Sequence, residues 1–258
     1  MGAALALHAL EGIPLVRAGD DLAALLLTAL ARTGFAFEDG DVVVLAQKIV
    51  SKAEGRLVRL ADVTPTDEAA RLAEETGKDP RLVELILRES TRVVRVRPGR
   101  PGVIVVEHRR GWVHANAGID QSNVVAGEPG AHALLLPEDP DGSAATLRAT
   151  LRERTGRNVG VLINDSAGRA WRIGTCGIAL GSAGITTLED LRGEPDLFGR
   201  RLEVSVVGRG DELAAAASLV MGQADEATPA VLVRGLAQED VPATAAELIR
   251  PAAEDLFR

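Results

Sequence analysis

The sequence predicts a mixed α/β protein, because short β-branched apolar runs alternate along the chain with segments of helical periodicity. The 258 residues are 46% hydrophobic and 26% charged, which is rich enough in apolar side chains to form a sizeable core. No apolar run approaches the roughly 20 residues of a membrane-spanning helix, and the N-terminus has no typical signal sequence. We therefore expect a cytoplasmic protein that does not interact with a membrane.

Five apolar runs are too short for helices and are expected as buried strands, at 42–45, 103–106, 159–163, 204–207 and 231–233. Helical periodicity and capping residues predict helices from Asp20 or Asp21 to Arg32, and at 66–75, 81–89, 143–155 and 211–221. A last helix is expected to start at Thr244, where Glu247 completes capping-box spacing, and to be interrupted by Pro251. The segment 128–142, rich in Gly, Pro and Asp, predicts a division into two lobes, about 1–130 and 131–258.

Composition excludes several classes of function. Lys and Arg total 29 against 37 Asp and Glu, a net charge of −8, and aromatic residues are few, so we expect no nucleic-acid partner. The single cysteine, Cys176, excludes an internal disulfide framework, and the four histidines show no metal-ligand spacing. The common nucleotide-binding loops, the serine-hydrolase elbow and the zinc-protease motif are all absent.

Candidate chemistry is confined to five polar segments at the ends of predicted elements, at 11–21, 46–56, 116–123, 164–172 and 221–229. In the second, Lys48 and Lys52 are four residues apart and would share one face if the segment is helical, suited to phosphate or simply solvated. In the third, Asp120, Ser122 and Asn123 offer oxygen ligands of the kind that Mg²⁺ or Mn²⁺ prefers, although an Asx-turn would explain them equally well.

The fourth segment follows the apolar run 159–163. The strand would end in Asp165 and Ser166, which places a carboxylate and a hydroxyl at its carboxyl end, where open α/β sheets often bind ligands. Arg169 and Arg172 follow closely as possible anion clamps. An ordinary polar turn is the alternative. Residue chemistry alone thus predicts an α/β protein with a candidate oxygen-ligated metal site.

Taken in order, the polar segments resemble a known family. The stretches IPLVRAGDDL, VSKAEGR, NAGIDQSN, LLPEDPDGSA, TGRNVGVLINDSAGRAWRIG and TPAVLVRGL are similar to those of the coenzyme F-420:gamma-glutamyl ligases, in their stand-alone form and in the N-terminal half of the actinobacterial two-domain enzyme. The resemblance runs from about Glu11 to Leu236. It implies a two-lobed ligase fold in an intertwined homodimer, as a single ligase domain over 1–258 without the flavin-binding C-terminal domain of the two-domain relatives.

The resemblance also implies roles for individual residues. Asp120 and Asp165 match catalytic, metal-binding aspartates, and the metal site would be completed by Ser166 and Gln223. The implied nucleotide-binding residues are Ile13, Pro14, Leu15, Val16, Gln47, Lys48, Lys52 and Asn123. Three positions depart from the family pattern: Ser166 stands where relatives often have Thr, Gln223 where some have Glu, and Gln47-Lys48 where relatives have Ser-Thr or Ser-Lys.

The activity implied is GTP-dependent ligation of L-glutamate to the deazaflavin precursor coenzyme F-420-0 through an acyl phosphate, followed by addition of γ-linked glutamates. The implied cofactors are two divalent cations, Mn²⁺ or Mg²⁺, with K⁺ as a further candidate. Two alternatives remain open at the level of sequence. One is an amide ligase that uses another carboxylate acceptor, and the other is a non-catalytic nucleotide- or metal-binding module.

Overall fold

The computed structural model describes residues 4–125, 130–236 and 242–255. Contacts group these residues into two compact units built from interleaved segments, whereas the sequence suggested consecutive halves. Unit 1 takes its described residues from 1–50, 138–166 and 176–248, and unit 2 from 51–137, 167–175 and 249–258. One of the crossings between units, at Pro137 and Glu138, falls inside the segment 128–142.

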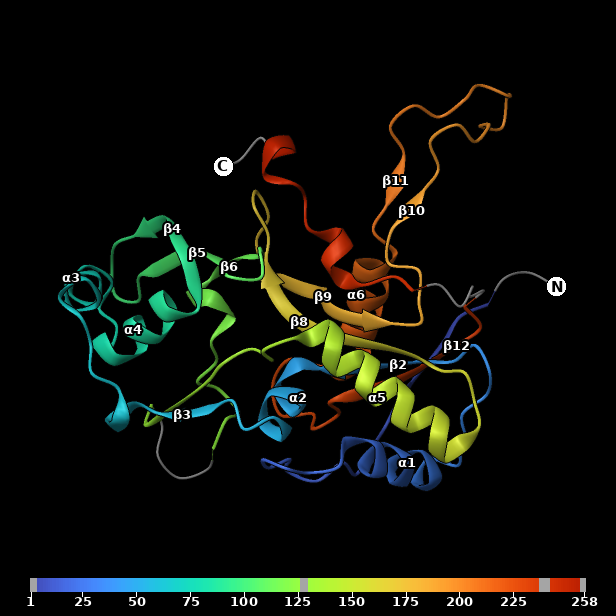
Figure 1. Ribbon diagram of the computed structural model, residues 1–258, viewed down its shortest axis with the longest axis horizontal. Coiled ribbons are helices and arrows are strands. Elements are labelled where there is room, and N and C mark those ends of the chain that lie inside the picture. The colour runs from blue at the N-terminus through green and yellow to red at the C-terminus, as the bar shows by residue number, and fades with distance from the viewer. Residues whose placement is uncertain (1–3, 126–129, 237–241, 256–258) are drawn as a thin grey trace. The chain divides into compact units, whose positions relative to one another are not determined.

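Unit 1 is organised around a five-stranded sheet in the order β1-β12-β2-β8-β9 (Figure 1). Its strands are β1 (Ala6–Ala9), β2 (Val42–Ala46), β8 (Gly160–Gly168), β9 (Thr175–Ala183) and β12 (Ala230–Arg234). β2 and β8 are parallel, while β12 runs antiparallel to both β1 and β2. The uninterrupted burial of β2 over Val42–Leu45 explains why its sequence is continuously apolar rather than alternating.

The helices of unit 1 are α1 (Leu22–Arg32), α5 (Pro140–Thr155) and α6 (Arg209–Met221). The alanine-rich α6 packs its small residues against the sheet, with Ala214 and Ala217 fully buried in one core cluster with Val44, Leu162 and Val231. A Cβ added at Gly177 of β9 would collide with the backbone of Ala214, so strand and helix touch at backbone distance.

The predicted helices of unit 1 form, with two corrections. Asp21 caps α1 as expected, by accepting the amide of Ala24 at 3.0 Å. α5 begins at Pro140 rather than at Ser143, because proline suits the first helical position. The helix expected from Thr244 is replaced by short 3-10 turns at Ala245–Leu248 and Ala252–Glu254. There the amides of Ala245 and Ala246 bond to the carboxylate of Asp141, a tertiary contact that outweighs the local capping signal.

The apolar run 204–207 is only in part a strand. β11 (Val206–Val207) pairs with β10 (Glu189–Asp190), and residues 191–205 form a long arm between them. Figure 1 shows this arm extending away from the sheet of its own unit. Because the arm packs on little else, Val204 is 85% exposed instead of buried, and the prediction of a buried strand is wrong there.

Unit 2 contains a three-stranded antiparallel sheet, β4 (Ser90–Arg97), β5 (Val103–His108) and β6 (Val113–Ala115). A second pair joins β3 (Leu57–Arg59) to β7 (His132–Leu134). The helices α3 (Asp67–Thr76) and α4 (Pro80–Arg88) start at the caps Thr66 and Asp79. Their apolar faces meet β5 in a core that includes Leu72, Val83, Ile86, Ile104 and Val106. The chain enters this unit through α2 (Gln47–Ala53).

None of the helices among the described residues is long and apolar enough to cross a membrane.

Candidate functional site

In unit 1, two predicted polar segments leave the sheet at the same edge. β2 and β8 are parallel neighbours, and Ala46 at the end of β2 lies opposite Asn164 of β8. Gln47 and Lys48 therefore follow one strand where Asp165 and Ser166 follow the last paired residue of the other. The carboxyl ends of adjacent parallel strands are the usual place for ligands in α/β sheets.

Asp165 and Ser166 lie within β8, as the prediction of a strand that ends in these residues requires, and not in an ordinary polar turn. β8 continues to Gly168, so both residues have strand conformation. Pairing with β2 nevertheless stops at Asn164, and both side chains are only partly buried. Asp165 and Ser166 thus lie just beyond the edge of the parallel pair, which is the feature that the prediction depended on.

A network of neutral side chains connects this edge to the end of α6. The hydroxyl of Ser166 donates to Oε1 of Gln223 at 2.7 Å, and Nε2 of Gln223 donates to Oγ of Ser218 at 3.2 Å. Nδ2 of Asn164 also lies 3.4 Å from that Ser218 oxygen. The structure therefore brings together two of the predicted metal-site residues, Ser166 and Gln223, with both ends of the Gln223 amide engaged.

Asn164 is a member of this network whose role the sequence did not single out. It is 3% exposed, and among the described residues its Oδ1 has no hydrogen-bond partner while Nδ2 is engaged. A buried amide oxygen without a partner is uncommon in folded proteins. Its position in the sequence could have drawn attention to it, because Asn164 is the polar residue that directly follows the apolar run 159–163.

The loop after α6 carries a fixed negative charge close in sequence to Gln223. The carboxylate of Glu226 accepts the amide of Ala224 at 2.8 Å. This backbone hydrogen bond, followed by others in the same loop, lowers the pKa of Glu226, so the group stays ionised. Glu226 is turned onto the backbone of its own loop, over Gly222, where any Cβ would collide with it.

The predicted nucleotide-contacting turn 13–16 is mostly at the surface. Leu15 is 84% exposed, whereas Val16 is buried and anchors the segment to its unit. Arg32 of α1 fixes the start of the turn by donating to the carbonyl of Gly12 at 2.9 Å.

The predicted lysine pair lies in a helix, which is the condition under which the two side chains share one face. α2 covers Gln47–Ala53, so Lys48 and Lys52 fall one turn apart on the same helical face. Gln47, by contrast, is only 1% exposed. It therefore has little surface for contact with a ligand.

In unit 2, the segment that carries Asp120 is held mainly through its backbone. The amide of Asp120 donates to the carbonyl of Leu134 at 3.0 Å, and the amide of Leu134 donates back to Asp120 at 2.8 Å. Further on, the ammonium of Lys52 donates to the backbone carbonyl of Asn123 at 2.7 Å. The structure therefore brings Lys52 and Asn123 together, through a main-chain oxygen.

The backbone before Asp120 has an unusual conformation. Asn116, Ala117 and Gly118 have φ of 54°, 56° and 69°, all in the left-handed region. Only glycine adopts this region freely, and such residues concentrate at functional sites. A Cβ on Gly118 would lie 2.7 Å from Cδ1 of Leu136, so this position has no room for a side chain. Sequence reasoning did not detect this strain, because Ala117 gives no sign of it.

Buried charges support this part of unit 2. Glu89 is 6% exposed and contacts Arg109 at 2.9 Å and Arg56 at 3.1 Å. Burial alone would raise the pKa of Glu89, but the imidazole of His108, whose Nε2 lies 3.5 Å away, and these two cations hold it below its usual value. Arg56 also donates to the carbonyl of Leu136 at 3.0 Å, the residue that covers Gly118.

His114 lies in β6, directly before the left-handed run. Burial, followed by the charge of His108, lowers its pKa from 6.5 to about 4. His114 is therefore neutral at physiological pH, and its protonation would place an additional charge inside unit 2.

Arg169 and Arg172 lie on the exposed loop between β8 and β9. The amide of Arg172 bonds to the carbonyl of Arg169 at 3.4 Å, and the intervening Trp171 is 88% exposed. Both guanidinium groups thus face solvent from a tight turn, in a position to meet an anion.

Within the described ranges, no three His, Cys, Asp or Glu side chains gather in a metal-binding cluster. The predicted donor set contains only two carboxylates, one in each unit, together with a serine and a glutamine. All of these donors are oxygen atoms, the chemistry that Mg²⁺ and Mn²⁺ prefer.

A mixed sheet with polar oxygen donors at the carboxyl edge of its parallel pair defines an α/β protein with a candidate ligand site. The chain belongs to the F420-0:gamma-glutamyl ligase family, whose members it matches over residues 12–235. It is 50% identical to the coenzyme F420:L-glutamate ligase of Methanothermobacter thermautotrophicus, over 98% of this chain and 99% of that protein. It is also 48% identical to the enzyme of the same name from Methanopyrus kandleri, over 96% of this chain and 97% of the relative. The corresponding protein of Archaeoglobus fulgidus is 44% identical, over 88% and 86% of the two chains.

Proposed function

We propose that this protein is a GTP-dependent ligase that joins L-glutamate to coenzyme F-420-0 and then adds further glutamates through γ linkages. The observation that carries the proposal is the 50% identity, over nearly the full length of both chains, to a protein named coenzyme F420:L-glutamate ligase. The polar groups at the edge of β2 and β8 and along 116–123 support it, because they supply oxygen donors and cations to a site for a nucleotide.

The proposed chemistry activates a carboxylate with GTP. An oxygen of the acceptor carboxylate attacks the γ-phosphorus, and the bond from that phosphorus to the β,γ-bridging oxygen breaks, which releases GDP and leaves an acyl phosphate. The amine of L-glutamate then attacks the acyl carbon. The C–O bond to phosphate breaks, inorganic phosphate leaves and the amine loses a proton, so that an amide has formed at the expense of one GTP.

Charge is the main obstacle to this reaction. GTP, the precursor and L-glutamate are all anions, and the chain itself has a net charge of −8. Two unit charges about 4 Å apart repel by roughly 4 kcal/mol at an effective dielectric of about 20. The site must therefore supply positive charge locally. Lys48 and Lys52 of α2 and the exposed Arg169 and Arg172 are the cations that we assign to this task.

Asp120, Asp165 and Ser166 fit divalent cations, because their side chains end in oxygen atoms and are only partly buried. These residues would hold two Mn²⁺ or Mg²⁺ ions, which would supply the positive charge needed to offset the charge that develops on the phosphates. Gln223 fits less well as a ligand, since its Oε1 already accepts from Ser166 and its Nε2 donates to Ser218. We assign K⁺ no residue.

The nucleotide itself is proposed to contact the turn 13–16, the start of α2 and Asn123. Lys52 would act in two ways, by presenting its charge to the phosphates and by holding the chain at Asn123 through the 2.7 Å bond to its carbonyl. Leu15 is exposed, as a residue in contact with a base or ribose should be before the nucleotide binds.

A homodimer is also part of the proposal, and the arm between β10 and β11 supports it. Leu197 and Phe198 at its tip are 98% and 94% exposed. The tip is nevertheless ordered by Asp196, which accepts the amides of Phe198 at 2.8 Å and Arg200 at 2.9 Å. Large apolar side chains presented on a fixed turn gain free energy when a second copy covers them. Phe198→Asp should shift the chain from dimer to monomer in light scattering, and an unchanged dimer would contradict this role of the arm.

The ligase activity is tested by incubating the purified protein with GTP, Mn²⁺, L-glutamate and coenzyme F-420-0. We expect GDP, phosphate and a product heavier than the precursor by one glutamyl residue or more. A non-catalytic nucleotide- or metal-binding module would release no phosphate and form no amide. A ligase for another acceptor would leave F-420-0 unchanged but release phosphate with a different carboxylate from a panel. A cytoplasmic location is proposed with this activity, since GTP is an intracellular nucleotide.

A further inference from the structure

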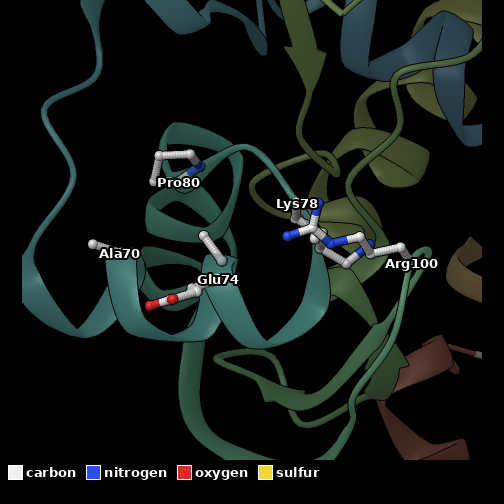
Figure 2. A pocket seen from close by; sticks show the side chains of 7 residues that line it. Ala70, Glu74, Lys78, Pro80 and Arg100 are labelled. Atoms are coloured by element: carbon white, nitrogen blue, oxygen red, sulfur yellow. The ribbon is translucent and has the colours of Figure 1, made fainter.

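Unit 2 has a shallow pocket where the end of α3 meets the start of α4, and none of the residues assigned to the reaction lines it. Its volume is about 360 Å³, and its walls include Glu74, Lys78, Pro80 and Arg100 (Figure 2). Lys78 and Arg100 come from different parts of the chain, and both extend their side chains along this pocket.

The position of Arg100 is fixed by the backbone. The loop that carries it is fastened to the C-terminus of α3 by two hydrogen bonds, from Gly99 to the carbonyl of Glu75 at 3.2 Å and from Gly102 to that of Thr76 at 2.9 Å. The aliphatic part of Arg100 lies across Gly77, where an added Cβ would be 2.5 Å from Cγ of the arginine. The guanidinium is therefore carried to the pocket by a supported side chain.

Lys78 is fixed in a similar way. Its amide bonds to the carbonyl of Ala73 at 3.1 Å, which closes the end of α3. Its side chain is partly buried, and this burial lowers the pKa of the ammonium, which indicates that the charged form lacks compensation.

Two of the nearby carboxylates are engaged with other cations. Asp79 pairs with Arg81 at 2.6 Å, and Glu75 lies 3.5 Å from Arg71. Over the part of the chain that the structure describes, neither the ammonium of Lys78 nor the guanidinium of Arg100 forms an ion pair or a hydrogen bond. Two cations on one pocket, neither of them in an ion pair with a described residue, are electrostatically unfavourable, since like charges repel and the partial burial of Lys78 removes water from its ammonium.

We propose that this pocket is a binding site for a small oxyanion, a carboxylate or a phosphate, held between Lys78 and Arg100. Both side chains donate hydrogen bonds to such oxygens, and guanidinium can do so in a bidentate manner. Glu74 on the wall leaves the three charged groups with a net charge of +1, so a ligand with one or two negative charges fits better than a triphosphate. The site is independent of the proposed ligase reaction.

The test uses the fact that the chain has only three lysines, Lys48, Lys52 and Lys78. Protein labelled with ¹³C at lysine Cε gives one NMR signal for each, and Lys78→Met identifies the third. Inorganic phosphate and L-glutamate are titrated in separate arms, which distinguishes a phosphate ligand from a carboxylate ligand. We expect one of them to shift the Lys78 signal saturably and to raise the pKa of Lys78, because a bound anion stabilises the ammonium.

Three variants sharpen the test. Arg100→Met should weaken binding at Lys78 about tenfold or more, since a charge-assisted hydrogen bond is lost. Glu74→Gln should strengthen binding a few-fold, because it removes a repelling charge. Arg71 lies on α3 and is paired with Glu75. Arg71→Met removes the same charge as Arg100→Met and should leave binding within about twofold.

The proposal is overturned if neither ligand shifts the Lys78 signal at millimolar concentration, or if Arg71→Met weakens binding as much as Arg100→Met does. The second result would mean that the anion is attracted by the general positive charge of the region and is not held by Arg100 in the pocket. Signals of Lys48 and Lys52 report separately on binding at the ligase site, so failure of the pocket and failure of the proposed activity are distinguishable.

Discussion

The two aspartates at the centre of the proposed reaction are held by different means. Asp165 of unit 1 lies at the end of a parallel strand pair, beside a network of neutral side chains that includes Ser166 and Gln223. Asp120 of unit 2 is held by two backbone bonds to Leu134, after a run of left-handed residues. One half of the site depends on sheet topology, and the other depends on an unfavourable backbone conformation.

This difference predicts that the two halves fail differently. In unit 1, a substitution in the network should change chemistry with little effect on the fold, because β2 and β8 are fixed by their buried apolar residues. In unit 2, conformation and site are inseparable, because the left-handed backbone persists only while Leu136 and the buried charges around Glu89 hold it in place.

The largest effect is expected from the aspartates themselves. Asp120→Asn and Asp165→Asn should each lower kcat about 10³-fold or more. Without one cation-binding carboxylate, the repulsion within at least one pair of negative charges is no longer offset, at a cost of roughly 4 kcal/mol. Each 1.4 kcal/mol is a factor of about ten in rate. Single-turnover release of phosphate from GTP measures the step directly.

Asp62→Asn, an exposed aspartate of unit 2 outside the proposed site, serves as the control and should retain kcat within about twofold. If either of the two site variants kept more than a tenth of the wild-type kcat with Mn²⁺ present, that aspartate would have no place in the mechanism. If kcat fell in only one of the two variants, the proposed site would contain only the aspartate of that variant.

The backbone-held half is tested by Gly118→Ala. The left-handed φ of 69° disfavours a Cβ, which would also lie 2.7 Å from Leu136. We expect the free energy of unfolding to fall by about 3 kcal/mol, with roughly half from backbone strain and half from overpacking. Chemical denaturation provides the measurement. Gly130→Ala is the matched control, since Gly130 has φ of 80° but no described atom lies within 4 Å of an added Cβ, and it should cost only about 1 kcal/mol.

Equal losses in the two glycine variants would mean that the contact with Leu136 is unimportant. The comparison between the halves would then rest on backbone conformation alone.

Acid should weaken the same half. The pKa of His114 is lowered to about 4 in the fold against 6.5 in the unfolded chain, so unfolding takes up a proton below pH 6.5. The stability contributed by neutral His114 is thus present above pH 6.5 and is lost progressively as pH falls towards 4. Between pH 7 and 5 this linkage amounts to about 2 kcal/mol.

His114→Gln removes the titrating group, so its stability should fall less than that of the wild type over this pH range, by about 2 kcal/mol. Urea unfolding at each pH gives the two curves. Parallel curves would show that His114 does not titrate with the fold.

The fold could be predicted from sequence to the extent that it depends on local pattern. Continuous apolar runs identified β2 and β12, and Asp21 and Thr66 marked the starts of α1 and α3. The helix expected from Thr244 failed because the carboxylate of Asp141, distant in sequence, binds the amides of that segment. Interleaving of the two units was likewise beyond local signals, since it depends on which distant segments pack together.

For the candidate site too, the features that depend on local pattern could be predicted and those that depend on tertiary packing could not. The parallel edge places Asp165 and Ser166 beyond the last pair with β2, as strand-end reasoning anticipates. The left-handed conformation of Ala117 and the role of Leu136 in covering Gly118 have no local signature in the sequence. Tertiary packing imposes both.

The smallest effect is expected at Gln223, where family resemblance and geometry suggest different roles. The resemblance implies a metal ligand, but both ends of its amide are engaged, with Ser166 at 2.7 Å and Ser218 at 3.2 Å. If Gln223 chiefly orients Ser166, Gln223→Ala should lower kcat about tenfold or less and leave the Mn²⁺ concentration for half-maximal activity within about twofold, because hydrogen bonds are lost but no ligand charge. Ser218→Ala removes the other end of the same bridge and should reproduce part of the loss in kcat. A tenfold or greater rise in the Mn²⁺ requirement of Gln223→Ala, with Ser218→Ala unaffected, would instead make Gln223 a ligand and the neutral network incidental.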